Sequence, residues 1–174
     1  MSEAERIAAL ERRIDELESR EAITALVYRY AELIRLGRPS ETLDLIAQDA
    51  VVELRHADPA DVSSSTLITR FVGHEQIRTS FVEHAGEGAR VWPMIHNLRI
   101  ELDNDRATSV CVLASAVWPI GKQFIGEYRD TYRRIEGRWK LASRSHIGFG
   151  DTSGTYASEA YEAYQATKES LAQT

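Results

Sequence analysis

The stretch that decides the fold is IHNLRIEL (95–102), ATSVCVLASAVW (107–118), FIGEYRDTYRRI (124–135) and WKLASRSHI (139–147). These four segments are rich in β-branched and aromatic residues, as strands usually are. The links between them, DND at 103–105, PIG at 119–121 and EG at 136–137, consist of residues that favour turns. Consecutive strands joined by short turns form an antiparallel meander. We therefore predict four long antiparallel strands in the second half of the chain.

The first half of the chain shows helical periodicity instead. Apolar residues recur every three or four positions from residue 3 to residue 36, until Gly37 and Pro39 stop the pattern. A second helix is predicted from Ser40, then a strand at 51–55, a polar loop at 57–66, a strand at 67–72 and a helix after Gly73. Helices gathered on one face of a curved antiparallel sheet define an α+β fold, and the space between them is a natural ligand site.

The domain organisation follows from the same pattern. Residues 1–20 are predicted to form an amphipathic helical extension with an apolar seam at Ile7, Leu10, Ile14 and Leu17. Two heptads are short for a coiled coil, so this seam is expected to pack on its own domain or on a neighbouring subunit. Residues 21–150 form the α+β domain, and residues 151–174 form a helical tail with a helix near 158–171.

Composition limits the classes of partner. The chain has 174 residues, 43% of them hydrophobic and 28% charged, and a formal net charge of −6, which disfavours nucleic acid and anionic membranes as partners. We expect a cytoplasmic location, because neither a signal peptide nor a membrane-spanning apolar run is visible. The one cysteine, Cys111, lies in an apolar run and is expected to be a buried, unreactive thiol.

Several segments resemble the SnoaL-like family of the nuclear transport factor 2-like superfamily. ITALVYRYAELIRLGRPSETLDLIAQDAVV (23–52) is similar to its opening helices and first strand, and FVGHEQI (71–77) to its glycine-then-helix step. MIHN (94–97) and GEYRDTY (126–132), followed by EGRWK (136–140), are similar to later strands. The resemblance implies a cone-shaped curved sheet whose helices pack on the concave face and enclose a pocket. It is closest to enzymes of the scytalone dehydratase and bile acid dehydratase type.

The resemblance also implies catalytic residues. His96 matches a histidine that accepts or donates a proton in those dehydratases, a role that suits imidazole at neutral pH. Tyr30 matches a tyrosine that hydrogen-bonds a substrate oxygen. Arg35 stands near the position of the family's aspartate, so a simple dehydratase assignment does not follow. A guanidinium there could hold an anionic oxygen, or it could be a solvent-facing residue at a helix end.

A second group of residues is predicted to bind substrate. Tyr and Trp offer flat apolar surfaces with one polar group, which suits an aromatic ligand, although such residues are more often part of a core. Asp130 could support His96 or Arg144, or form a buried structural pair with Arg144. Strand alternation places Arg144 and His146 on one face of the last strand and Trp139 and Leu141 on the other. The predicted substrate-binding residues are Trp92, Trp118, Phe124, Tyr128, Asp130 and Arg144.

These observations predict a cofactor-independent lyase, of dehydratase or retro-aldol type, or an isomerase. Its substrate would be small, hydrophobic, aromatic and hydroxylated. No metal is expected, because the histidines lack metal-ligand spacing, and no phosphate loop or nucleophile elbow is present. The alternative is a non-catalytic ligand-binding or oligomerisation domain like the dioxygenase β subunits. In either case a homo-oligomer is expected, with a trimer favoured over a dimer by the resemblance.

Overall fold

The computed structural model describes residues 1–58, 61, 63–84, 90–118 and 122–151. The chain begins with helix α1 (Glu3–Arg35) and the 3-10 helix η1 (Pro39–Leu45), and helix α2 (Gly73–His84) follows the second strand. Six strands complete the fold: β1 (Ile46–Ala57), β2 (Ser65–Val72), β3 (Arg90–Asp103), β4 (Arg106–Trp118), β5 (Lys122–Ile135) and β6 (Arg138–Asp151). The predicted α+β class is confirmed, and the four predicted strands of the second half are present as β3 to β6.

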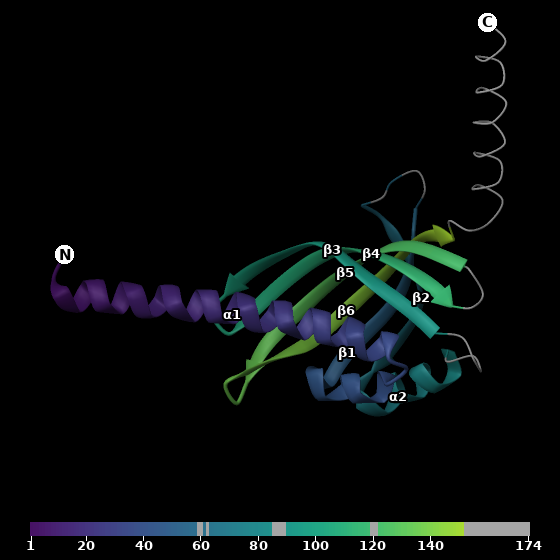
Figure 1. The fold of residues 1–174 in the computed structure, drawn as a ribbon, viewed down its shortest axis with the longest axis horizontal. Coiled ribbons are helices and arrows are strands. Elements are labelled where there is room, and N and C mark those ends of the chain that lie inside the picture. Colours follow the sequence, from purple (N-terminus) through teal and green to yellow (C-terminus); the bar gives the residue numbers. More distant parts are fainter. Residues whose placement is uncertain (59–60, 62, 85–89, 119–121, 152–174) are drawn as a thin grey trace, which may run out of the picture.

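The six strands form one curved, open sheet in the order β2-β1-β6-β5-β4-β3. Neighbouring strands are antiparallel except β1 and β6, which run parallel. Helix α1 crosses one face of the sheet, and η1 and α2 lie close to the end of α1 (Figure 1). We call this covered side the inner face and the opposite side the outer face.

Helix α1 is a single unbroken helix. A capping box begins it: the Ser2 hydroxyl accepts from the Glu5 N–H, and the Glu5 carboxylate accepts from the Ser2 N–H. It ends at Arg35, after which Gly37 takes a left-handed φ of 71° that glycine adopts without strain. The predicted extension (1–20) and the first helix of the domain therefore share one helical axis.

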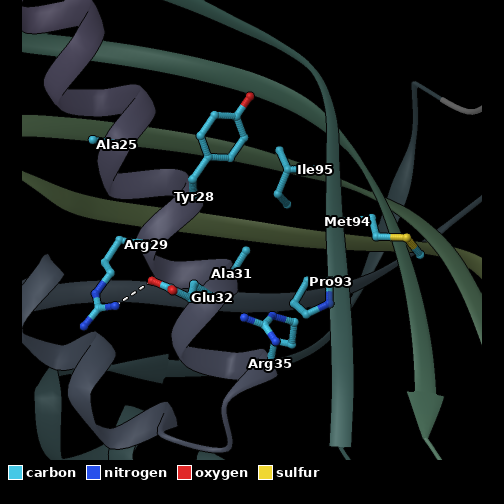
Figure 2. A pocket seen from close by; sticks show the side chains of 9 residues that line it. All are labelled: Ala25, Tyr28, Arg29, Ala31, Glu32, Arg35, Pro93, Met94 and Ile95. Carbon is cyan, nitrogen blue, oxygen red and sulfur yellow. Dashed lines mark hydrogen bonds and ion pairs between the residues drawn. The ribbon is translucent and has the colours of Figure 1, made fainter.

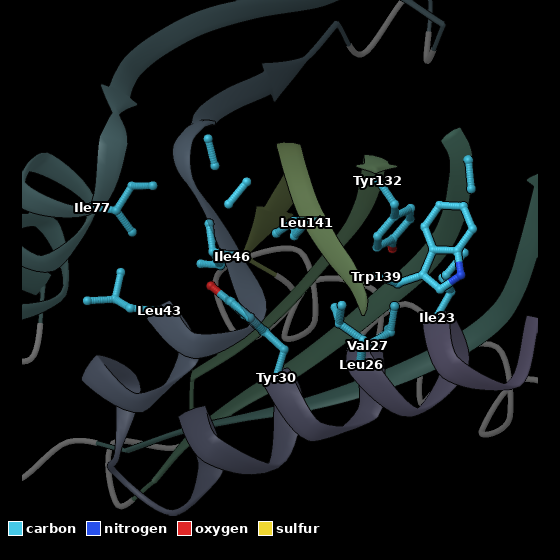
Figure 3. Close-up of a cluster of buried hydrophobic side chains, with 13 residues drawn as sticks. Ile23, Leu26, Val27, Tyr30, Leu43, Ile46, Ile77, Tyr132, Trp139 and Leu141 are labelled. Atoms are coloured by element: carbon cyan, nitrogen blue, oxygen red, sulfur yellow. The ribbon is translucent and has the colours of Figure 1, made fainter. Parts of the chain in front are cut away.

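The main core lies between the second half of α1 and the inner face of the sheet. Ile23, Leu26, Val27 and Tyr30 of α1 face it, as their helical spacing predicts. Figure 3 shows them directed toward side chains that the sheet and the other helices contribute, and the labelled members are Leu43, Ile46, Ile77, Tyr132, Trp139 and Leu141.

Register shifts occur in several strand pairs, and two of them, the bulges in β3 and β6, change the facing of predicted site residues. In β3, His96 pairs with Val112 and Arg99 with Val110, so two residues of β3 oppose one of β4. Asn97, inside this bulge, has a positive φ of 54°. In β6, Leu141 pairs with Tyr132 and Ser143 with Thr131, which leaves Ala142 as an extra residue. Each bulge changes which residues reach the inner face.

Some local predictions differ from the structure. The second helix is a 3-10 helix that begins at Pro39 and has no side-chain cap at its start, so Ser40 is not its N-cap. Strands β1 and β2 are longer than the segments predicted at 51–55 and 67–72. The predicted C-terminal tail lies outside the described residues, apart from Asp151. None of the described helices has the length and apolar character needed to cross a membrane.

Candidate functional site

A cluster of polar and aromatic side chains lies on the inner face where β4, β5 and β6 meet the end of α1. The register brings Ser109 of β4 opposite Asp130 of β5, and Asp130 opposite Arg144 of β6. Asp130 and Arg144 are almost completely buried, with 1% and 2% of their surfaces exposed. We call the group formed by Ser109, Asp130 and Arg144, together with Tyr30, Tyr128 and Tyr132, the Arg144 cluster.

Arg144 and Asp130 form a bidentate salt bridge. The Arg144 Nε donates to Asp130 Oδ1 at 2.9 Å, and Nη2 donates to Oδ2 at 2.7 Å. The Tyr132 hydroxyl also donates to Asp130 Oδ2, at 2.9 Å, and lies 2.8 Å from the Ser109 hydroxyl. The Asp130 carboxylate is thus satisfied by three donors, as a buried charge requires.

The third nitrogen of the guanidinium is not satisfied. Arg144 Nη1 is buried and has no hydrogen-bond partner among the described residues. The guanidinium carbon lies 4.2 Å from the Tyr30 ring centroid and 3.9 Å from the Tyr128 ring centroid, where the aromatic faces stabilise the positive charge. A buried N–H without a partner costs about 1–3 kcal/mol. Arg144 therefore offers a donor, inside an aromatic environment, that an oxygen atom could satisfy.

Arg144 and the three tyrosines of this cluster keep their protons at neutral pH. Burial disfavours the charged guanidinium, but the Asp130 carboxylate outweighs burial and holds the pKa of Arg144 well above its ordinary value. Burial raises the pKa values of Tyr30, Tyr128 and Tyr132, so the three tyrosines stay protonated phenols. Arg144 and the three phenols are therefore donors whose protonation does not change near neutral pH.

Cys111, which lies opposite Tyr128 in the β4–β5 register, is also buried. Burial raises the pKa of its thiol to about 11. A thiol in this state is a poor nucleophile, in agreement with the prediction of a buried, unreactive side chain.

His146 is the titratable residue next to this cluster. It follows Arg144 by two residues on β6, and its ring meets the Tyr128 ring edge-on at a centroid distance of 5.1 Å. Burial, followed by the Arg144 charge, lowers the pKa of His146 to about 4. The imidazole is therefore neutral at pH 7 and can accept a proton. Tyr128 contacts both His146 and Arg144 and links the two into one site.

The predicted catalytic residues separate in the structure. Tyr30 faces inward and contacts Arg144, as expected. His96 is exposed and pairs with Val112, whereas the β4 residues that line the inner face are Ser109, Cys111 and Leu113. Because successive residues alternate, His96 lies on the outer face. Arg35 is exposed at the end of α1, which matches the solvent-facing alternative that the sequence left open.

The predicted substrate-binding residues also divide into two groups. Tyr128, Asp130 and Arg144 come together in the Arg144 cluster, and the predicted Asp130–Arg144 pair is present. Trp92 and Phe124 have 46% and 39% of their surfaces exposed, and neither belongs to the buried clusters. The side chain of Trp118 lies outside the described part of the chain.

Arg35 lines a separate open groove between α1 and β3. Tyr28 and Arg35 border it on the helix side, and Pro93, Met94 and Ile95 border it on the strand side (Figure 2). Arg29 and Glu32 form an ion pair at 2.5 Å along its edge. Neither Tyr30 nor Arg144 lines this groove, so it is distinct from the cluster on the inner face.

Sequence reasoning missed the roles of His146, Tyr132 and Ser109. The signal for Tyr132 was available, since Tyr128, Asp130 and Tyr132 alternate on β5. For Ser109, only the register of two strands shows that it faces Tyr132. Among the described residues, no group of three His, Cys, Asp or Glu side chains is placed to hold a metal ion.

Comparison with known proteins defines the family. A family model described as the SnoaL-like domain matches residues 15–145. The protein therefore belongs to the SnoaL-like family, as the sequence motifs indicated. A search of curated proteins gave no match.

Solved structures share the fold at low identity. The β subunit of a proposed aromatic-ring-hydroxylating dioxygenase from Novosphingobium aromaticivorans has a TM-score of 0.66 and 14% identity, over 78% of this chain and 92% of that chain. A proposed scytalone dehydratase from the same organism has a TM-score of 0.60 and 17% identity, over 79% and 88%. A type 2 hexachlorocyclohexane dehydrochlorinase has a TM-score of 0.61 and 16% identity, over 80% and 91%. At these identities the likeness establishes the fold alone.

Proposed function

We propose that this protein is a cofactor-independent lyase or isomerase that acts by general acid/base catalysis on a small, hydrophobic, hydroxylated aromatic molecule. The observation that carries the proposal is the buried, unpaired Nη1 of Arg144 between the rings of Tyr30 and Tyr128. Membership of the SnoaL-like family, together with fold neighbours named as a dehydratase and a dehydrochlorinase, supports it.

In this proposal Arg144 holds the substrate oxygen that gains negative charge. Nη1 donates a hydrogen bond to a carbonyl oxygen, and the charge on the guanidinium stabilises the enolate that forms when a neighbouring carbon loses its proton. The Tyr30 and Tyr128 rings supply apolar surfaces for an aromatic ring. Because Asp130 already neutralises the guanidinium, its charge does not by itself require an anionic substrate.

His146 is the proton acceptor in this proposal. Its neutral imidazole takes the proton from carbon, and the electron pair moves to the oxygen held by Arg144. In a dehydratase the C–O bond at the next carbon then breaks, and the departing hydroxide takes the proton from the imidazolium and leaves as water. Negative charge on the substrate oxygen offsets the effect of Arg144 and raises the pKa of His146 toward the working range.

The test compares two histidines on opposite faces of the sheet. Purified protein is incubated with a panel of hydroxylated aromatic ketones, and turnover is followed by the change in ultraviolet absorbance on loss of water or on isomerisation. With the substrate so found, we expect His146→Gln to lower kcat by about 10²- to 10⁴-fold, and His96→Gln, on the exposed outer face, to keep the wild-type rate.

Thermal unfolding of both variants confirms that they are folded. Loss of turnover in His96→Gln but not in His146→Gln would support the catalytic role that the resemblance predicted for His96 and overturn the role of His146. Absence of both binding and turnover across the panel would contradict the proposed substrate class.

A second candidate function is a non-catalytic ligand-binding subunit. The exposure of His96 and Arg35 favours it, because two of the three catalytic residues implied by the resemblance lie away from the inner face. The fold neighbour named as a dioxygenase β subunit agrees with this candidate. It predicts that aromatic compounds bind, that Tyr30→Leu, which removes the ring, weakens binding, and that no compound is converted.

A further inference from the structure

The first half of α1 carries an apolar stripe that the domain does not cover. Ile7, Leu10, Ile14 and Leu17 have 51%, 63%, 53% and 52% of their surfaces exposed. In Figure 1 this half of the helix projects beyond the sheet. Isolated exposed apolar residues are common, but four at alternating steps of three and four form a continuous seam.

The seam lies on the side of α1 that faces away from the domain. Ser19 is buried and receives a hydrogen bond from Arg134, so its side of the helix packs on the sheet. Leu17 is two positions earlier, which places it about 200° around the helix. Since α1 is continuous, the seam cannot turn back onto the described part of its own domain, and it is open there to another molecule.

The residues of the seam favour a two-stranded coil. In heptad notation Ile7 and Ile14 occupy a positions, and Leu10 and Leu17 occupy d positions. β-branched residues at a with leucine at d favour parallel dimers over trimers. The helix is already formed and anchored, with a capping box at its start, so pairing does not have to meet the cost of helix nucleation.

The flanking charges select a second copy of this chain in parallel orientation. The e positions are Glu11 and Glu18, and the g positions are Arg6, Arg13 and Arg20. In a parallel pair, each g residue faces the following e residue of the other helix. Arg6 then faces Glu11 of the second copy, and Arg13 faces Glu18. An antiparallel pair would bring arginine to arginine and glutamate to glutamate.

We propose that residues 6–18 of two copies form a short parallel coiled coil that holds the protein as a dimer. The two domains point outward from such a coil, because each lies on the side of α1 opposite to the seam. The next a position is Glu21, which is exposed, so two glutamates would face each other and the coil ends there. This proposal does not depend on the proposed activity of the Arg144 cluster.

Disulfide trapping tests the orientation. Identical d residues lie side by side in a parallel coil, within the distance that a disulfide can bridge. We expect full-length Leu10→Cys to form a covalent dimer under mild oxidation. Arg12→Cys, at the f position on the far side of the helix, is the matched control and should not. The native Cys111 is buried and does not compete. Equal crosslinking of both variants, or of neither, would overturn the proposal.

Two further experiments test the interface in solution. One measures the molecular mass of seam variants, and the other reverses the charges beside the seam. Ile14→Asp should lower the mass measured by light scattering to half of the wild-type value, which is that of a monomer, whereas Arg12→Asp should not change it. Arg13→Glu should weaken association several-fold, and the double variant Arg13→Glu/Glu18→Arg should restore it. An unchanged mass for Ile14→Asp, or tighter association for Arg13→Glu, would contradict a parallel coil.

Discussion

Residues 129 and 130 of β5 are neighbours in sequence but meet opposite environments. The Asp130 side chain is inaccessible to water and holds Arg144 through two hydrogen bonds on the inner face. The Arg129 side chain is 42% exposed on the outer face, where its Nε lies 2.5 Å from Glu127. Both are ion pairs between one arginine and one carboxylate. The inner pair is buried and has two hydrogen bonds, whereas the outer pair is partly exposed and has one, so the two pairs should differ in what they contribute to stability.

The two pairs should differ most when one partner is removed. Arg144→Met leaves the Asp130 carboxylate buried without its counter-ion, and we expect the free energy of unfolding to fall by about 3–5 kcal/mol. Arg129→Met is the matched control and should change it by about 0–1 kcal/mol, because the Arg129 side chain is 42% exposed and Glu127, at 20%, keeps some contact with water. Urea denaturation of both variants at neutral pH measures the difference. Equal losses would show that the inner pair is hydrated.

A double variant separates the charge from the packing. In Arg144→Met/Asp130→Asn the buried charge is gone, and the amide oxygen of the new side chain can still accept the hydrogen bond from Tyr132. We expect the double variant to be more stable than Arg144→Met alone, with a coupling of about 1–3 kcal/mol between the two sites. A double variant less stable than Arg144→Met would contradict the charge explanation.

The same comparison shows what the sequence could predict. The helical period of α1 indicates that Tyr30 lies on its core side, and alternation along β5 indicates that Tyr128, Asp130 and Tyr132 share one face. These elements are regular, so counting residues works. The resemblance to the SnoaL-like family supplied the fold, which the family match confirms.

Alternation does not predict which face of the sheet a side chain occupies where a strand contains a bulge. Simple alternation put Trp139 and Leu141 on the face opposite to Arg144, but the extra residue at Ala142 brings all three to the inner face. That prediction was wrong for this reason. In β3 the bulge at Asn97 leaves both His96 and Asn97 exposed. A bulge depends on how two strands pair, which a single sequence does not specify.

Gly126 gives a related example from β5. In the structure a Cβ at this position would lie 2.6 Å from the carbonyl oxygen of Ile147 on β6. Close approach of two backbones therefore accounts for this glycine, and the approach results from another register shift, next to Ile125.

The two faces can also be compared through the pH dependence of stability, with His146 on the inner face and His96 on the outer face. An unfolded histidine has a pKa near 6.5, whereas that of His146 is about 4 in the folded protein. Between these values the unfolded chain binds more protons, so the stability that comes from the neutral imidazole is lost as the pH falls from about 6.5 to about 4. Because the His146 side chain is only half-buried, the effect is reduced. We expect the free energy of unfolding of wild type to fall by about 1–2 kcal/mol more than that of His146→Gln over this range.

Urea denaturation at pH 6.5 and pH 4.5 measures this loss for wild type and for both histidine variants. His96→Gln should follow the wild-type pH dependence, since the side chain that it replaces is exposed. Identical pH dependence of wild type and His146→Gln would mean that water reaches the imidazole freely, which would remove the desolvated environment assigned to it.

The smallest expected effect is the coupling between Arg129 and Glu127. Its size shows whether water reaches the outer face in solution. A double-mutant cycle on Arg129→Met and Glu127→Gln should give a coupling of about 0–1 kcal/mol, because the Arg129 side chain is 42% exposed and only Glu127 is partly buried. The coupling should also weaken as salt is added, because exposed charges are screened. A coupling of several kcal/mol that salt does not change would mean that these side chains are desolvated.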